Sequence, residues 1–111
     1  KKLKKKLNQK YRYQMILDIH ENDQSTIITL CDSELVGKTF EEGKKILDLS
    51  SDYYNGEEYT DTSVIADTLR NADIIMAVGQ KAIDLLKREE LLTSEETKTI
   101  QEIPYTQVVI E

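Results

Sequence analysis

The sequence contains one cysteine and one histidine, and this scarcity excludes several kinds of site. Cys31 has no second cysteine to pair with, so an internal disulfide is excluded and a reducing compartment is indicated. With His20 as the single imidazole, the chain lacks the soft ligands that a structural zinc site requires. We therefore expect no bound metal and no cofactor.

Long hydrophobic runs are missing as well. The longest apolar run covers residues 74–78, far short of the roughly 20 residues that a membrane-spanning helix needs. The lysine-rich start is positive like the first part of a signal peptide, but no apolar stretch follows it. We expect a cytoplasmic protein without a membrane partner.

Aromatic residues make up 6% of the chain, with no tryptophan, one phenylalanine and six tyrosines. The core must therefore consist mainly of isoleucine, leucine and valine. A chain of 111 residues is long enough for one domain that buries such a core without covalent cross-links.

Charge is divided unevenly along the chain. Residues 1–12 carry no acid and seven basic side chains, namely Lys1, Lys2, Lys4, Lys5, Lys6, Lys10 and Arg12. Residues 13–111 hold the other eight basic residues and all 21 acidic ones, a formal charge of −13. A phosphate backbone should attract the first segment and be repelled by the rest.

Alternating apolar residues predict a β-hairpin over residues 15–31, with a turn at 21–24. A four-residue loop at that position pairs Leu17 with Ile28 and Met15 with Leu30, all on one face. Gly37 closes a single predicted helical turn, and residues 44–49 are predicted as a third strand.

Two longer helices are predicted in the second half of the chain. Asp61 begins the first, whose inward face is expected to hold Val64, Ile65, Leu69 and Ala72. Residues 73–78 are predicted as a short apolar strand or an extended entry to the second helix. Gly79 begins that helix, with Ala82, Ile83, Leu85 and Leu86 facing the core. The chain ends in a weakly alternating stretch at 97–103 and a strand at 106–110.

These elements predict one small α+β domain, residues 15–111, with a mostly antiparallel sheet and two main helices. Residues 1–14 are predicted as a basic N-terminal helical extension. Its apolar residues recur every four positions along one helical stripe, at Leu3, Leu7 and Tyr11.

Four segments resemble an archaeal family of unknown function, the domain-of-unknown-function family 424: residues 31–40, 54–57, 78–82 and 104–109. The resemblance covers about residue 15 to the C-terminus. Members of that family resemble one another at positions that are present here as Cys31, Asp32, Glu34, Leu35, Gly37 and Lys38. The resemblance implies a small domain with helices and strands in the archaeal cytosol, and no established activity.

Two catalytic interpretations of this motif are weak. Gly37, Lys38 and Thr39 suggest a phosphate-binding loop, but that motif requires glycine where Asp32 stands, so we expect no nucleotide cofactor. Cys31 could act as a nucleophile, but the predicted hairpin places it about 20 Å from His20. A buried apolar cysteine is the favoured interpretation.

A helix that begins at Gly79 offers free N–H groups to an anion, with Lys81 in its first turn. In addition to the basic segment, the candidate anion-binding residues are therefore Gly79, Lys81 and Lys38. The plainer interpretation of Gly79 is a tight turn between a strand and a helix.

Three functions remain open from the sequence. The favoured one is a non-enzymatic module of the translation or RNA-processing machinery, which contacts RNA or the ribosome through its basic segment. The second is a protein–protein adaptor that inserts Leu3, Leu7 and Tyr11 into a groove of a partner protein. The third is a small enzyme or thiol sensor built on Cys31 with Asp32 and Lys38.

Overall fold

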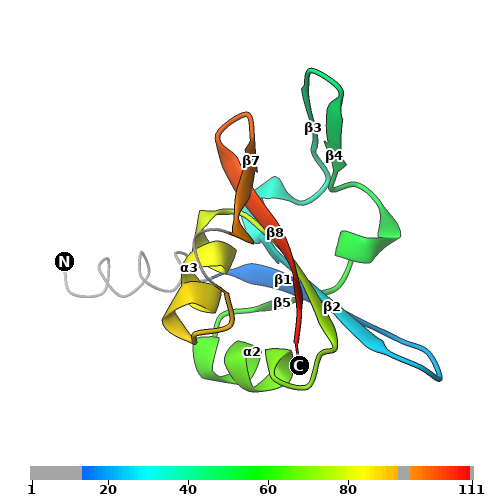
Figure 1. Ribbon diagram of the computed structural model, residues 1–111, viewed down its shortest axis with the longest axis vertical. Helices are drawn as coiled ribbons and strands as arrows, with labels where there is room; N and C mark the ends of the chain where they lie inside the picture. Colours follow the sequence, from blue (N-terminus) through cyan, green and yellow to red (C-terminus); the bar gives the residue numbers. More distant parts are fainter. Residues whose placement is uncertain (1–13, 93–95, 111) are drawn as a thin grey trace.

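The centre of the molecule is a mixed β-sheet. The computed structural model describes residues 14–92 and 96–110. Within them, six strands lie side by side in the order β5 (Glu57–Tyr59), β1 (Met15–Glu21), β2 (Thr26–Asp32), β6 (Ile74–Val78), β8 (Ile103–Val109) and β7 (Lys98–Ile100) (Figure 1). Strands β2 and β6 pair in parallel, and every other neighbouring pair in this sheet is antiparallel. The predicted α+β domain with a mostly antiparallel sheet is confirmed.

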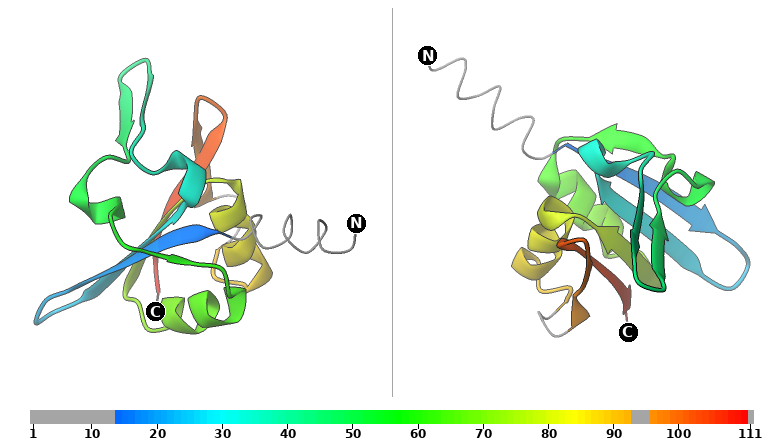
Figure 2. Two further views of the ribbon diagram at one scale, coloured as in Figure 1. Left: turned by 180° about the vertical axis from the view of Figure 1, so that it is seen from behind. Right: turned by 90° about the horizontal axis from the view of Figure 1, so that it is seen from above.

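One face of the sheet is covered by the helices α2 (Thr62–Leu69) and α3 (Gln80–Arg88) (Figure 2). Buried residues of both helices pack on Leu30, Ile75 and Val108 of the sheet. The predicted inward residues of α3 are confirmed, because Ala82, Ile83, Leu85 and Leu86 are all buried. This main core holds the helices in place and so fixes the position of the N-terminus of α3.

Helix α2 begins where the sequence predicts. Asp61 is its N-cap, and its Oδ1 accepts a hydrogen bond from the backbone N–H of Ser63 at 2.9 Å. The prediction for Val64 is wrong, because this side chain is 44% exposed. Ile65 and Leu69, four positions apart, point at the sheet instead, and Val64 lies about 100° around the helix from Ile65.

The first hairpin forms as predicted, but in a different register. The structure pairs Leu17 with Leu30 and Met15 with Asp32, so each partner lies two residues beyond the predicted one. The turn lies at residues 22–25 because the Asn22 side chain organises it: its Oδ1 accepts hydrogen bonds from the backbone N–H groups of Gln24 and Ser25. A shift of two residues keeps every side chain on its predicted face.

A smaller apolar cluster lies on the opposite face of the sheet. Its buried members are Cys31, Leu49, Tyr54 and Val78. The short helices η1 (Ser33–Leu35) and η2 (Asp52–Tyr54) contribute to it, as does the hairpin of β3 (Thr39–Glu42) and β4 (Lys45–Asp48), which forms a separate two-stranded sheet. The predicted third strand is confirmed as β4, and Gly37 ends the turn after η1 with φ of +89°.

The β3–β4 hairpin and the β7–β8 hairpin project together from the sheet (Figure 1). The backbone N–H of Gln101 donates to Oε1 of Glu42 at 2.6 Å, and its side-chain amide donates to the carbonyl oxygen of Glu41 at 2.7 Å. Lys45 Nζ also donates to the carbonyl oxygen of Thr99 at 3.4 Å. These three hydrogen bonds join the two hairpins near their tips.

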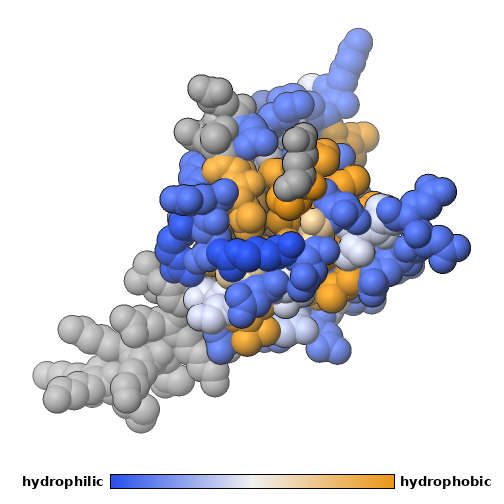
Figure 3. Space-filling model, turned by 60° about the horizontal axis from the view of Figure 1, so that its bottom comes forward, coloured by the Kyte–Doolittle hydropathy of each residue, from blue (hydrophilic) through white to orange (hydrophobic). Residues whose placement is uncertain are grey.

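Apolar residues reach the surface on the side shown in Figure 3, where they gather among hydrophilic ones. Among the described residues, the most exposed large hydrophobic side chains are Ile46 at 67% and Val109 at 63%.

The predicted helical extension at residues 1–14 falls almost entirely outside the described residues, which begin at Gln14. Among the residues that the structure describes, no helix is both long enough and apolar enough to cross a membrane.

Candidate functional site

Cys31 lies near the end of β2 and is fully buried, with 0% of its side chain exposed. Burial, with smaller contributions from the carboxylates of Asp32 and Glu34, raises the pKa of the thiol to about 12. His20 is far along the hairpin, opposite Ile27, whereas Cys31 is opposite Ile16. Cys31 is therefore a protonated, apolar core residue at neutral pH, without an imidazole beside it.

Asp32, the next residue, binds the N-terminus of α3. Its Oδ1 accepts a hydrogen bond from the backbone N–H of Ala82 at 2.8 Å, and its Oδ2 accepts one from that of Lys81 at 3.1 Å. The residue is 3% exposed. Burial raises the pKa of its carboxyl group, and the two backbone hydrogen bonds act in the opposite direction. Asp32 thus caps a helix that lies 49 residues further along the chain.

Gly79 makes this close approach feasible. It is the N-cap of α3 with φ of +106°, a conformation that residues with a side chain rarely adopt. A Cβ atom at this position would lie 2.3 Å from Cγ of Asp32. The strand-to-helix turn and the buried carboxylate therefore require glycine here.

The free helix N-terminus predicted at Gly79 and Lys81 is occupied by the chain itself. Asp32 takes two of the N–H groups that an external anion would need, and Lys81 Nζ forms an ion pair with Oε2 of Glu34 at 3.1 Å. The physical reason is the parallel pairing of β2 and β6, which places Cys31 opposite Val78 and so brings Asp32 to the start of α3.

Gly37 and Lys38 serve a different local purpose. The backbone N–H of Gly37 donates to the carbonyl oxygen of Leu49 at 2.8 Å, and Leu49 N–H donates back to the carbonyl oxygen of Lys38 at 2.8 Å. This pair of bonds closes the base of the β3–β4 hairpin, and Leu35 packs on the smaller apolar cluster beside it. The backbone here pairs with the chain itself, and the Lys38 side chain is exposed.

The structure thus brings together Cys31, Asp32, Glu34, Gly79 and Lys81, and it places Gly37 and Lys38 nearby at the hairpin base. The basic residues predicted to contact RNA, Lys1 to Arg12, lie outside the described residues. Within residues 14–92 and 96–110, no group of three or more side chains is arranged to hold a metal ion.

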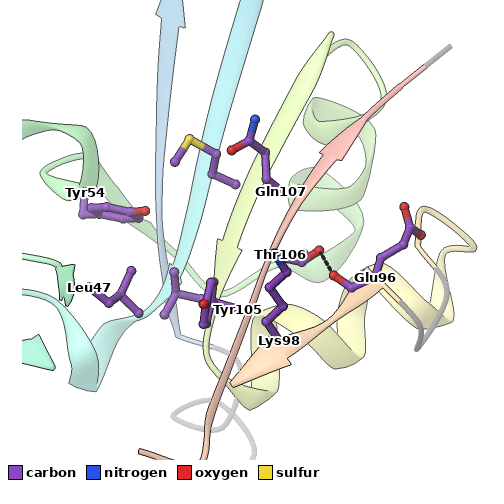
Figure 4. A pocket seen from close by; sticks show the side chains of 9 residues that line it. Leu47, Tyr54, Glu96, Lys98, Tyr105, Thr106 and Gln107 are labelled. Atoms are coloured by element: carbon purple, nitrogen blue, oxygen red, sulfur yellow. Dashed lines mark hydrogen bonds between the residues drawn. The ribbon is translucent and has the colours of Figure 1, made fainter. Parts of the chain in front are cut away.

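A pocket opens on the sheet face opposite the helices, with a volume of about 280 Å³. We call it the sheet-face pocket. Strands β4, β6, β7 and β8 and helix η2 form its walls, with a contribution from Glu96 (Figure 4). Its lining residues are Leu47, Tyr54, Met76, Val78, Glu96, Lys98, Tyr105, Thr106 and Gln107.

Apolar and polar groups have distinct places in this pocket. Leu47, Met76 and Val78 provide apolar surface, and the hydroxyl end of Tyr54 points from η2 toward strands β6 and β8 (Figure 4). Thr106 Oγ1 donates to the carbonyl oxygen of Glu96 at 2.8 Å, which ties the β7 side to β8. Such an arrangement can bind a small ligand.

The sheet-face pocket could not be predicted from the sequence. Its residues come from segments as far apart as Leu47 and Gln107, and only a tertiary fold brings them together. The predicted strand at 106–110 included Gln107 but not Tyr105, which the structure places on the same face of β8 (Ile103–Val109). Which face would remain open could not be read from the alternation along this strand.

Comparison with known families gives a match over most of the chain. The family model described as "Protein of unknown function (DUF424)" matches residues 19–110. None of the curated proteins matches the chain.

Among solved structures, the crystal structure of an uncharacterized conserved protein from Methanopyrus kandleri, an archaeon, has a similar fold. Its TM-score is 0.73 at 22% sequence identity, and the alignment covers 88% of this chain and 95% of that one. At this identity the likeness establishes the shared fold.

Proposed function

The chain belongs to the family described as protein of unknown function DUF424, and since that description names no activity, we propose a function from the chain's own residues. The protein is a non-enzymatic module of the translation or RNA-processing machinery. It contacts RNA phosphates through the seven basic side chains of residues 1–12.

The observation that carries the non-enzymatic part is the use of the Cys31–Asp32 pair. The thiol is buried and protonated, and both oxygens of the carboxylate accept hydrogen bonds from the backbone of α3. A catalytic thiol or carboxylate must reach a substrate and change its protonation state near neutral pH. These groups instead hold β2, β6 and α3 together.

The charge distribution supports RNA as the partner. Residues 13–111 carry a formal charge of −13, so long-range attraction to RNA must come from the first twelve residues. Seven phosphate contacts correspond to a slope of about −6 for the logarithm of the RNA affinity against the logarithm of the salt concentration, for a duplex.

The test measures the affinity of the full chain for duplex RNA at several salt concentrations. The double variant Lys4→Gln/Lys5→Gln should reduce the slope by about 2, because two phosphate contacts are lost. The matched control Lys44→Gln/Lys87→Gln removes the same charge from two exposed positions of the domain and should leave the slope unchanged. Equal changes of the slope in the two variants, or an RNA affinity that does not depend on the salt concentration, would contradict the proposal.

Ribosome association is tested by co-sedimentation of the same proteins from native cytosol, with and without RNase. Capture that RNase abolishes, and that Lys4→Gln/Lys5→Gln weakens, is the expected result. Capture that resists RNase would indicate the adaptor function, with a protein as the partner.

A further inference from the structure

We propose that the sheet-face pocket binds one unstacked nucleotide of a single-stranded RNA. This inference rests on the proposed RNA-binding function and adds to it a site in the folded domain, on the face away from the helices. The base would lie against the tyrosines and the apolar surface, and the adjoining phosphate would lie at Lys98.

The strongest indication of a ligand is the hydroxyl group of Tyr54. This side chain is 6% exposed, and its hydroxyl points into the pocket (Figure 4). Among residues 14–92 and 96–110 it makes no hydrogen bond, and since it is not one of the fully buried polar atoms without a partner, it is accessible from the pocket as a free donor. Burial, with a smaller effect from Cys31, raises the pKa of Tyr54, so the group remains a hydrogen-bond donor.

The size of the pocket limits the ligand. A volume of about 280 Å³ lies just below the range of roughly 300–1,000 Å³ that is typical of sites for small molecules. A single planar ring system suits such a space, and a folded peptide or a large cofactor does not. Unstacked bases of single-stranded RNA are bound in this way, against aromatic side chains.

The polar groups around the pocket match a nucleotide. The Gln107 amide both donates and accepts hydrogen bonds, as the edge of a base requires, and Lys98 supplies a positive charge for a phosphate. Neither side chain makes a hydrogen bond or ion pair within the described part of the chain. The carboxylate of Glu96 points away from the other labelled side chains (Figure 4), so the pocket presents a cation rather than an anion. A basic peptide is therefore disfavoured.

The experiment uses the full chain and labelled oligonucleotides of each of the four bases, with a duplex RNA of equal length. Tyr54→Phe removes only the unpartnered hydroxyl, and Lys98→Gln removes the charge. Tyr59→Phe and Lys87→Gln are the matched controls, because Tyr59 is half-buried outside the pocket and Lys87 is an exposed residue of α3 on the other face.

Tyr54→Phe should weaken single-strand binding about fivefold, the usual effect of one lost hydrogen bond, and should leave duplex binding unchanged. Its melting temperature should equal that of the unmodified chain, because the hydroxyl bonds no described residue; a purely structural role would lower it. Lys98→Gln should reduce the salt slope for single strands by about 0.7. Single-strand affinities of both variants equal to those of the controls would overturn the inference.

Free nucleoside monophosphates form a second arm of the experiment. We expect them to bind far more weakly than the oligonucleotide, because the basic segment can add phosphate contacts only to a polymer. Equal or tighter binding of the free nucleotide would overturn RNA as the source of the ligand. In a last comparison, a basic peptide competes with the oligonucleotide for the unmodified chain and for Tyr54→Phe. Displacement from the unmodified chain but not from the variant would overturn the nucleotide as the ligand in favour of a protein.

Failure of this inference can be distinguished from failure of the proposed function. If only the pocket inference is wrong, the Tyr54 and Lys98 variants bind like their controls, while Lys4→Gln/Lys5→Gln still lowers the salt slope. If only the basic-segment contact is wrong, the pocket variants weaken single-strand binding and the lysine pair has no effect.

Discussion

Gly79 illustrates how one residue supports the whole N-terminus of α3. Its positive φ and its closeness to Asp32 are two separate constraints. Gly37 has only the first of them, so a comparison of the two glycines separates their effects on stability. Gly37 also has a positive φ, of +89°, but a Cβ atom there would have no neighbour within 4 Å.

We expect Gly79→Ala to lower the free energy of unfolding by about 3 kcal/mol, through backbone strain and the clash with the Asp32 carboxylate. Gly37→Ala should cost about 1 kcal/mol, because it adds strain alone. Urea unfolding of both variants measures the difference. Equal losses would show that the approach of Asp32 to Gly79 does not constrain the fold.

Cys31 makes stability depend on pH in the alkaline range. Its thiol has a pKa of about 12 when folded, against 9.0 for an exposed thiol. From pH 9 to about 12 the unfolded chain loses this proton while the folded chain keeps it. The free energy of unfolding should therefore fall by up to about 1.4 kcal/mol for each pH unit above 9.

The measurement compares unfolding of the unmodified chain with that of Cys31→Ala between pH 8 and pH 10. Lysines and tyrosines titrate in both proteins, so the difference between the two slopes reports the thiol alone. Parallel slopes would mean that Cys31 ionises equally in the folded and unfolded chains, which a buried thiol should not do.

At the level of elements, the turn between β7 and β8 carries unusual backbone angles. Gln101 and Glu102 have φ of +48° and +67°, a combination that a two-residue hairpin loop needs and that glycine or asparagine normally supplies. Gln101 is fixed by its bonds to the β3–β4 hairpin, whereas no hydrogen bond from the Glu102 side chain is seen among the described residues.

Glu102→Gly should therefore stabilise the protein by about 1 kcal/mol, because it relieves left-handed strain without removing a contact. Glu41→Gly, a change of the same kind within strand β3, should destabilise it by about 0.5–1 kcal/mol. Thermal melting of both variants tests the pair. A loss of stability in Glu102→Gly would mean that the glutamate side chain contributes more than the strain costs.

The elements that could be predicted are those with local causes. Asp61 caps α2 two residues from the N–H group it binds, and the alternation of β1 and β2 assigns each side chain to a face. The register was missed because the Asn22 side chain moved the turn while leaving that alternation intact.

The site was harder to predict because its contacts are long-range. The capping of α3 by Asp32 depends on the parallel pairing of β2 with β6, which no local pattern encodes. Similarly, no local pattern predicts the burial of Tyr54, since it depends on strands before and after it in the sequence. The fold class followed from residue patterns, and the candidate site required three-dimensional contacts.

At the scale of the whole molecule, unbalanced charge should weaken the folded state. Residues 13–111 carry a formal charge of −13, and the described ion pairs use few of the acids, such as Glu34 with Lys81 and Glu89 with Arg70. Like charges concentrated on a compact body repel one another, and salt screens that repulsion.

The melting temperature of the full chain should therefore rise by a few degrees between about 0.05 M and about 0.5 M NaCl at neutral pH. Chloride is the appropriate anion, because sulfate strengthens apolar burial by another route. A melting temperature that falls with NaCl would mean that attractive ion pairs outweigh the repulsion.

The hydrogen bonds of Gln101 to Glu41 and Glu42 affect how a ligand would bind between the β3–β4 and β7–β8 hairpins. Leu47 on one hairpin and Tyr105 on the other line the sheet-face pocket, and these hydrogen bonds already join the two hairpins near their tips. The distance between these two pocket walls is therefore preorganised, and a ligand would lose little binding free energy in bringing the two hairpins together.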